Sequence, residues 1–282
     1  MLIAVRHVTR YTYDAPSRFQ VQSLRLTPSD FDGQRVVRWE IEAPSIGGAM
    51  RFRDGFGNVG HLLSVHEPLS ELVIVASGVI ETTDRAGVVR GLVEPSPTRV
   101  YLRETPTTAP SEAIRALVAG VSTGVLAGEA LARMHGLMHA VRDAVEYRIG
   151  VTSAHTTAAE ALAEGQGVCQ DHAHVFISGA RLLGVPARYV SGYYLDGGDG
   201  PSEAAHAWAE AFIDGIGWIA FDPANRFCPT DHYVRVACGL DAASAAPVRG
   251  TRSGGAKSDL DVVVEVHRQQ QQQSQSQSQT QG

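Results

Sequence analysis

Residues 165–176 have the sequence Gly165-Gln166-Gly167-Val168-Cys169-Gln170-Asp171-His172-Ala173-His174-Val175-Phe176, and this stretch decides the fold of the chain. Apolar residues recur at helical spacing after the two glycines, at Ala173, Phe176, Ile177, Ala180 and Leu183. Gly184-Val185-Pro186 ends the pattern, because proline cannot continue a helix. The pattern predicts a helix of about four turns that begins at Cys169.

A cysteine in the first turn of a helix is well placed for nucleophilic chemistry. The first N–H groups of a helix have no partner inside it and carry partial positive charge. That charge favours the thiolate of Cys169, and the same N–H groups can donate to an oxyanion. A lone cysteine is equally compatible with a small buried apolar residue, so a catalytic interpretation depends on partners elsewhere in the chain.

A predicted hairpin downstream supplies two such partners. Residues 205–213 alternate apolar and polar character, with His206 near their start. Residues 214–217, Asp-Gly-Ile-Gly, predict a turn. Residues 218–222 then form the returning strand, which ends at Asp222.

The loop length of this hairpin decides whether the two side chains can meet. Side chains alternate between the faces of a strand with a period of two. A three-residue loop pairs Ile213 with Gly217, places Trp208 opposite Asp222, and makes His206 the diagonal neighbour of Asp222 on the same face. A two-residue loop would put His206 and Asp222 on opposite faces.

Four blocks of the sequence together resemble the bacterial branch of the transglutaminase-like superfamily. They are Gly-Val-Cys-Gln-Asp at 167–171, Pro-Ala-Arg-Tyr-Val-Ser-Gly-Tyr at 186–193, His-Ala-Trp-Ala-Glu at 206–210 and Gly-Trp-Ile-Ala-Phe-Asp-Pro at 217–223. The N-terminal portion resembles the β-rich domain that commonly precedes this core. The resemblance implies an α+β fold with a papain-like core, in which a helix carrying Cys169 packs on an antiparallel sheet carrying His206 and Asp222 as a catalytic triad.

The resemblance also implies a reaction, namely cysteine-dependent acyl transfer on amide bonds through a thioester at Cys169. His206 would move the proton and Asp222 would orient the imidazole, while an amine or water accepts the acyl group. Gln166 and Trp208 are candidate contacts to the oxyanion or the substrate. The expected substrate is a protein or peptide with amide groups, and no cofactor is expected.

Two other functions fit the same fold. One is a cysteine peptidase or amidase that hydrolyses peptide or isopeptide bonds with the same triad. The other is a non-catalytic binding module, against which the intact set of Cys169, His206 and Asp222 argues.

The choice between an amine and water as acceptor depends on how dry the site is. Candidate walls of an acceptor channel are Trp208, Trp218, Tyr193, Tyr194 and the loop 196–202. The glycines and aspartates of that loop are typical of a solvated cover, and the two tryptophans are typical of hairpin core. We therefore expect hydrolysis to compete with transfer.

A metal site is a weaker interpretation of this region. Cys169 and His172 lie three residues apart on one predicted helix, and His135 and His139 lie four apart on another. A zinc site needs three or four protein ligands, and no further cluster of fitting spacing is present in the sequence. We expect no metal. His172 departs from the family pattern, in which this position is usually apolar.

The chain divides into three expected parts. Residues 1–105 predict a β-sandwich-like domain, with strands at 3–13, 23–28, 36–42, 61–65 and 72–81. Residues 106–268 form the expected catalytic domain, with helices at 110–119 and 128–147 and further strands at 187–195, 233–237 and 260–266. Residues 269–282 are a Gln/Ser-rich tail that we expect to be disordered.

Composition excludes several classes of protein. The 282 residues are 44% hydrophobic and 19% charged, as in soluble globular proteins. A net charge of −6 argues against nucleic acid as a partner, and no apolar run is long enough to span a membrane. The three cysteines form no disulfide framework. Without a recognisable export signal, we expect a cytoplasmic location.

Overall fold

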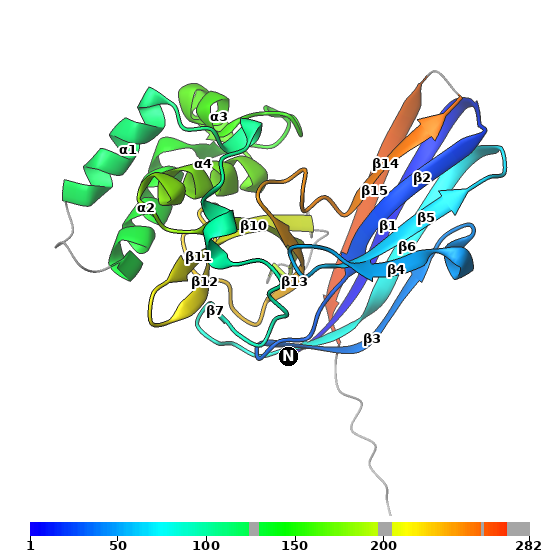
Figure 1. Cartoon of the computed structure of the whole chain (residues 1–282), viewed down its shortest axis with the longest axis horizontal. Helices are drawn as coiled ribbons and strands as arrows, with labels where there is room; N and C mark the ends of the chain where they lie inside the picture. The colour runs from blue at the N-terminus through cyan, green and yellow to red at the C-terminus, as the bar shows by residue number, and fades with distance from the viewer. Residues whose placement is uncertain (124–129, 197–204, 255–256, 270–282) are drawn as a thin grey trace, which may run out of the picture.

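The computed structural model describes residues 1–123, 130–196, 205–254 and 257–269. A β-sandwich of two sheets lies beside a unit in which helices cover a further sheet (Figure 1). The predicted α+β class is therefore confirmed. In the described ranges, no helix combines the length and the apolar character needed to cross a bilayer. The expectation of a disordered tail concerns residues 270–282, which lie outside these ranges.

The sandwich contains the strands of the N-terminal part and two strands from near the C-terminus. They are β1 (Leu2–Ser17), β2 (Phe19–Thr27), β3 (Gln34–Glu42), β4 (Met50–Arg53), β5 (Val59–Val65), β6 (Leu69–Thr82), β14 (Val248–Ser253) and β15 (Ser258–Arg268). One sheet has the order β15-β1-β6-β3 and the other β14-β2-β5-β4. The sequence analysis does not predict β4, a strand of only four residues that is largely exposed.

The pairing of β15 crosses the predicted boundary between the two domains. A strand at 260–266 was expected within the catalytic domain of residues 106–268, but β15 pairs antiparallel with β1. Conversely, β7 (Val88–Val89) lies within residues 1–105, which were expected to form a separate domain, but it pairs with β12 (Gly217–Phe221). Alternating polarity indicates a strand, but it does not say which sheet the strand joins.

The second unit consists of a sheet and the helices that cover it. Its sheet has the order β13-β10-β11-β12-β7, with β10 (Ala187–Tyr194), β11 (Ala205–Ile213) and β13 (Tyr233–Gly239). The helices are α1 (Glu112–Thr123), α2 (Ala130–Ala144), α3 (Ala158–Glu164) and α4 (Cys169–Leu182). Short 3-10 turns lie at Ile46–Gly48, Thr98–Leu102 and Pro106–Thr108.

Local signals explain why α3 stops just before α4. The Thr157 hydroxyl accepts from the backbone N–H of Glu160 at 3.2 Å, and the Glu160 carboxylate accepts from the backbone N–H of Thr157 at 2.8 Å. This capping box fixes the start of α3. Gly165, with φ of 67°, ends the helix in the left-handed conformation that glycine adopts most readily.

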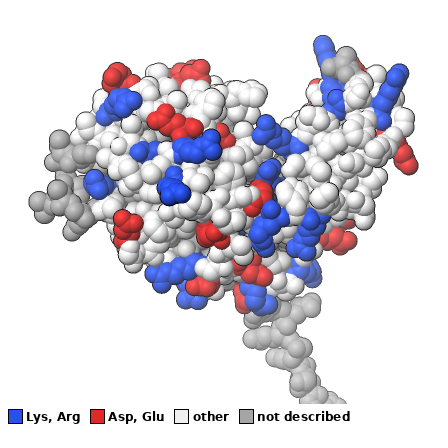
Figure 2. Space-filling model, in the orientation of Figure 1, with Lys and Arg blue, Asp and Glu red and all other residues white. Residues whose placement is uncertain are grey.

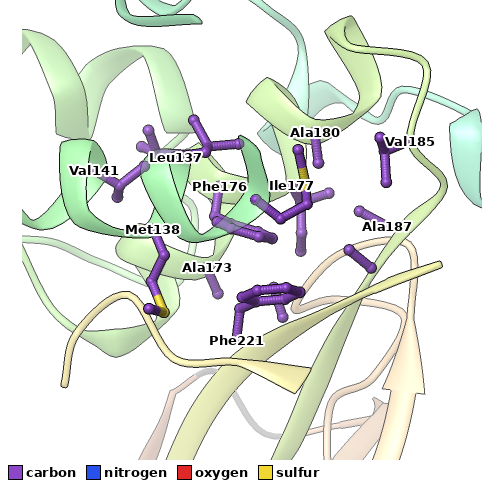
Figure 3. Packing of buried hydrophobic residues seen from close by; sticks show 14 of the residues in the cluster. Leu137, Met138, Val141, Ala173, Phe176, Ile177, Ala180, Val185, Ala187 and Phe221 are labelled. Atoms are coloured by element: carbon purple, nitrogen blue, oxygen red, sulfur yellow. The ribbon is translucent and has the colours of Figure 1, made fainter. Parts of the chain in front are cut away.

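The core between α4 and the sheet holds the start of α4 in place (Figure 3). Phe176 of α4 stacks on Phe221 of β12, with ring centroids 5.3 Å apart. Leu137 and Met138 of α2 belong to the same buried cluster. Full burial of each such side chain stabilises the fold by about 1.5–3 kcal/mol. The predicted packing of the cysteine helix on an antiparallel sheet is therefore confirmed.

A buried ion network lies within the same sheet. Glu210 accepts from Arg188 Nε at 2.5 Å and from Arg235 Nε at 2.8 Å, and all three side chains are buried. Burial would raise the pKa of Glu210, but the two arginines outweigh this effect and lower it to about 2. Arg188 also forms an ion pair with Glu94, 2.9 Å away, which connects the segment after β7 to the sheet. Charges on the surface are mixed, with basic and acidic side chains interspersed over the face in Figure 2.

The sandwich and the second unit are packed against each other. Ile3 and Val5 of β1 lie in one buried cluster with Val234 of β13. In the same interface, Nδ1 of His7 lies 2.9 Å from the hydroxyl of Tyr193, and both side chains are buried. The sandwich therefore supports the strands that reach the candidate site.

Candidate active site

Cys169 is the first residue of α4, as predicted. The backbone N–H of Val168 donates to the Asp171 carboxylate at 2.8 Å, and the Thr152 hydroxyl donates to the same oxygen at 2.6 Å. A Cβ at Gly167 would lie 2.7 Å from the Cβ of Asp171, so only glycine permits this close approach. These contacts fix the backbone on both sides of the half-buried Cys169 thiol.

The hairpin of β11 and β12 has the predicted register. Ile213 pairs with Gly217, which confirms the three-residue loop, and the ladder continues to Ala209 and Phe221. Asp222 follows directly and forms an isolated bridge with Phe227. His206 and Asp222 therefore reach the same end of the hairpin.

Three side chains predicted from the sequence meet at this point. Nε2 of His206 lies 2.6 Å from Oδ2 of Asp222, and the Cys169 thiol shares a hydrogen bond with the His206 side chain. Because Nε2 is directed at Asp222, Nδ1 is the ring nitrogen left for the thiol. Asp222 is fully buried, and the His206 side chain is 8% exposed. This arrangement can move a proton between the sulfur and a leaving group.

Two further residues bind Asp222. The hydroxyl of Tyr233 donates to Oδ2 of Asp222 at 2.7 Å, and Nδ2 of Asn225 donates to the same oxygen at 2.8 Å. The backbone N–H of Asn225 donates to Oδ1 at 3.2 Å. With the bond to His206, one carboxylate oxygen is thus held by three side chains.

The surroundings of His206 and Asp222 favour their charged forms. Burial would lower the pKa of His206, but the hydrogen bonds and charges of Asp222 and Cys169 outweigh it and raise this pKa to about 10. Burial would raise the pKa of Asp222, but its bonds to His206, Tyr233 and Asn225 lower it overall. The site therefore holds an imidazolium beside a carboxylate at neutral pH.

Comparison with known proteins agrees with this geometry. The family model of the transglutaminase-like superfamily matches residues 115–223, and that of the bacterial transglutaminase-like N-terminal region matches residues 3–81. An uncharacterized protein of Mycobacterium leprae is 32% identical over 280 residues, which cover 93% of this chain and 97% of the relative. The chain belongs to the transglutaminase-like superfamily.

Further similar proteins cover nearly the whole length of this transglutaminase-like chain. An uncharacterized protein of Mycobacterium tuberculosis is 28% identical over 300 residues, which cover 93% of this chain and 91% of the relative. A candidate cysteine protease from Cytophaga hutchinsonii has a crystal structure with a TM-score of 0.73 and 22% identity, covering 95% of this chain and 90% of that one. The latter similarity shows the fold.

Gln166 and Trp208 were the two other candidates for contact with the oxyanion or the substrate. Their surroundings differ from each other, since Gln166 binds a polar side chain and Trp208 is buried among apolar ones. Gln166 lies in β9 (Gln166–Gly167), which pairs with β8 (Glu146–Tyr147), and its Oε1 accepts from Arg148 at 3.0 Å. Trp208 is only 2% exposed and lies in a hydrophobic cluster. Its ring stacks on His206, with centroids 6.3 Å apart and an interplanar angle of 27°. Trp208 therefore supports the imidazole from the core.

His172 lies in the first turn of α4, and its side chain is fully buried. Its Nδ1 is 2.8 Å from the carbonyl oxygen of Val168 and its Nε2 is 2.9 Å from that of Val145. Burial lowers the pKa of His172 overall, although both carbonyls oppose this shift. His172 thus links α4 to the segment after α2. Among the described residues, no group of three or more His, Cys, Asp or Glu side chains could hold a metal ion.

Sequence reasoning missed Tyr233 and Asn225. Asn225 lies in the turn after Asp222, where its spacing of three residues is the only local signal. Tyr233 begins β13, and it reaches the site because β13 pairs with β10, where Tyr233 lies opposite Tyr194. No local pattern in the sequence predicts the pairing of β13 with β10.

Proposed function

We propose that this protein is an enzyme that performs cysteine-dependent acyl transfer on the amide bonds of proteins or peptides, with water competing effectively against amines as the acceptor. The observation that carries the proposal is the hydrogen-bonded set of Cys169, His206 and Asp222 at the start of α4. A thiol that shares a hydrogen bond with a base, which a third group orients, is the arrangement of an activated nucleophile.

In the proposed reaction, His206 holds the proton that it has taken from the Cys169 thiol, and the thiolate Sγ attacks the carbonyl carbon of the amide. The carbonyl oxygen becomes an oxyanion, which the N–H groups at the start of α4 stabilise. The carbon–nitrogen bond then breaks, and the proton on Nδ1 of His206 passes to the leaving amine or ammonia. A thioester remains on Cys169.

The second half of the reaction releases the acyl group. Water or an amine attacks the thioester carbon, and His206 takes the proton of the attacking group. The carbon–sulfur bond breaks and the sulfur leaves as the thiolate. Asp222 holds the imidazole in one orientation throughout and stabilises its charged form.

The aromatic residues near the site support water as a competing acceptor. Trp208, Trp218 and Tyr193, three of the candidate channel walls, are only 2%, 5% and 2% exposed. They are parts of hydrophobic clusters. Tyr194 is half-buried, and its ring centroid is 5.5 Å from that of His206. The candidate cover at 196–202 lies almost wholly outside the described residues.

A peptidase or amidase is the second candidate, favoured by the same burial of the aromatic residues. The protein from Cytophaga hutchinsonii that shares the fold was solved as a candidate cysteine protease. A non-catalytic binding module is the least supported function, because it would give no reason for Asp222 to be held by three side chains while His206 faces Cys169.

The decisive experiment follows the fate of the acyl group. A glutamine-containing peptide is incubated with the protein, with and without an excess of a primary amine, and ammonia, amine adduct and new peptide ends are measured. We expect ammonia release in both reactions and a mixture of hydrolysed peptide and adduct with amine. Product that partitions almost wholly to the adduct would contradict effective competition by water.

The control is Cys169→Ala, which removes the proposed nucleophile. New peptide ends without ammonia release would favour the peptidase. A cell extract incubated with the protein and a labelled amine, followed by mass spectrometry, extends the search to protein substrates. Absence of any product that depends on Cys169 from both substrate sources would contradict the proposed enzymatic function.

A further inference from the structure

The outer edge of β15 is a second feature of interest, separate from the proposed reaction. β15 is an edge strand, and no other described strand pairs with its far side. Gln269 N donates to Leu2 O at 2.9 Å, and Asp14 N donates to Lys257 O at 3.4 Å. Odd-numbered residues therefore turn their backbone groups toward β1. Because these directions alternate in an antiparallel ladder, the even-numbered residues of Ser258–Arg268 turn theirs outward.

This edge carries charged side chains but lacks two features that protect other edges from pairing, namely a bulge and a lysine or proline. Its register with β1 runs without a bulge from one end to the other, and β15 contains neither lysine nor proline. Leu260, Val262 and Val263 are 58%, 46% and 46% exposed. The opposite edge of the same sheet, β3, has a register shift between Val36 and Arg38. A long edge without such a bulge can act as a template for another strand.

We propose that β15 pairs antiparallel with β15 of a second copy of this chain, so that two four-stranded sheets become one. Such a contact is isologous, with the same surface contributed by each copy around a two-fold axis. An axis perpendicular to the sheet keeps each side chain on its own face. Each residue therefore pairs with a residue of the same face, which leaves few registers to consider.

Charge and apolar contact favour the register with Val264 on the axis. In this register Asp261 lies opposite His267, whose imidazole can donate to the carboxylate. Val262 lies opposite Val266, so that the exposed valine gains an apolar neighbour across the interface. Opposite-charge or polar pairs and β-branched pairs facing each other across strands stabilise a sheet.

The neighbouring registers place like charges together. With Val263 on the axis, Asp261 lies opposite Glu265 in both halves of the dimer. With Glu265 on the axis, the two glutamates lie opposite each other. Like charges directly opposite on adjacent strands are destabilising, so the register is a specific part of the proposal.

Sedimentation of the full chain tests the dimer. We expect the protein, whose chain mass is 30.1 kDa, to sediment as a dimer. Val262→Pro removes an outward N–H that β1 does not use, and Val262→Lys adds a charge to the edge, so both variants should be monomers. Val37→Lys is the matched control, because Val37 is also 46% exposed but lies on β3. It should stay dimeric.

A wild-type protein that remains monomeric at about 100 µM would contradict the proposal, since a dimer with a Kd of about 1 µM would be almost fully formed at that concentration. Dimers that persist in both Val262 variants, or that are lost only in Val37→Lys, would place the interface elsewhere and would also overturn it.

Cross-linking tests the register. In the proposed dimer the odd-numbered residues form the closely spaced, non-hydrogen-bonded pairs, about 4.5 Å apart between Cα atoms, which suits a disulfide. Val263 lies opposite Glu265, so a mixture of Val263→Cys and Glu265→Cys proteins should form a disulfide between copies under mild oxidation. Peptide mass spectrometry locates the bond. Efficient self-linking of Val263→Cys alone would contradict this register.

Discussion

Tyr233 donates a hydrogen bond of 2.7 Å to the same oxygen of Asp222 that lies 2.6 Å from Nε2 of His206. Tyr233 therefore controls both the position and the charge of the group that orients the imidazole. Hydrogen bonds to charged groups contribute about 1.5–3 kcal/mol, which makes this hydroxyl a sensitive target for mutation.

Tyr233→Phe should lower kcat/KM about tenfold or more, because Asp222 loses one of three side-chain donors. The phenylalanine ring keeps the contact with Trp208, so the melting temperature should change little. Tyr194→Phe is the control, since Tyr194 packs on the rings of His206 and Tyr233 and its hydroxyl makes no hydrogen bond to the triad within the described residues. Equal effects of the two variants on steady-state kinetics would contradict this role of Tyr233.

Cys169 should be the first thiol to react with iodoacetamide at neutral pH. It lies half-buried beside His206. Burial raises the pKa of the Cys228 thiol to about 11, and Cys238 is fully buried. Brief labelling followed by tryptic mapping compares the three sites. Equal labelling of all three would show that the position of Cys169 confers no reactivity.

His206→Ala should reduce the acyl-transfer rate by about 10²–10⁴-fold, the usual contribution of a general acid–base group. Asp222→Ala should cost less, because His206 keeps its contact with the thiol. Circular dichroism establishes that both variants are folded, and ammonia release gives the rates. Full activity in His206→Ala would assign the proton transfers to another group.

The reaction should tolerate alkaline pH. His206 must hold a proton to protonate the leaving amine, and its pKa is raised to about 10. We therefore expect kcat/KM for an amide substrate to fall only as the pH rises through about 10. In Asp222→Asn the negative charge that raises this pKa is absent, so the fall should move to lower pH. An identical alkaline limb in both proteins would contradict the coupling.

Glu210→Ala should destabilise the fold by about 3–5 kcal/mol, because it leaves the buried Arg235 without its carboxylate and Arg188 with Glu94 alone. Glu71→Ala removes one partner of an exposed pair, Arg10 and Glu71, whose side chains are 44% and 45% exposed. It should cost less than about 1 kcal/mol. Denaturant unfolding measures both, and comparable losses would show that the buried network contributes no more than a surface pair.

Patterns within short stretches were enough to predict much of this protein. Helical spacing after Cys169, the stop at Pro186 and the loop between Ile213 and Gly217 depend on neighbouring residues only. They predicted the cysteine helix, the hairpin and the meeting of His206 with Asp222. These features follow from backbone geometry, whose periods of about 3.6 and 2 residues leave a direct trace in the sequence.

Only the tertiary structure decided which distant segments pair. It placed β15 beside β1 instead of in the sheet that carries His206, and it brought Tyr233 to Asp222 through the pairing of β13 with β10. It also buried Trp208, which the sequence offered as a substrate contact. An alternating strand can join any sheet with a free edge and a matching apolar face. The choice among those edges depends on packing over the whole molecule, which no single stretch of sequence contains.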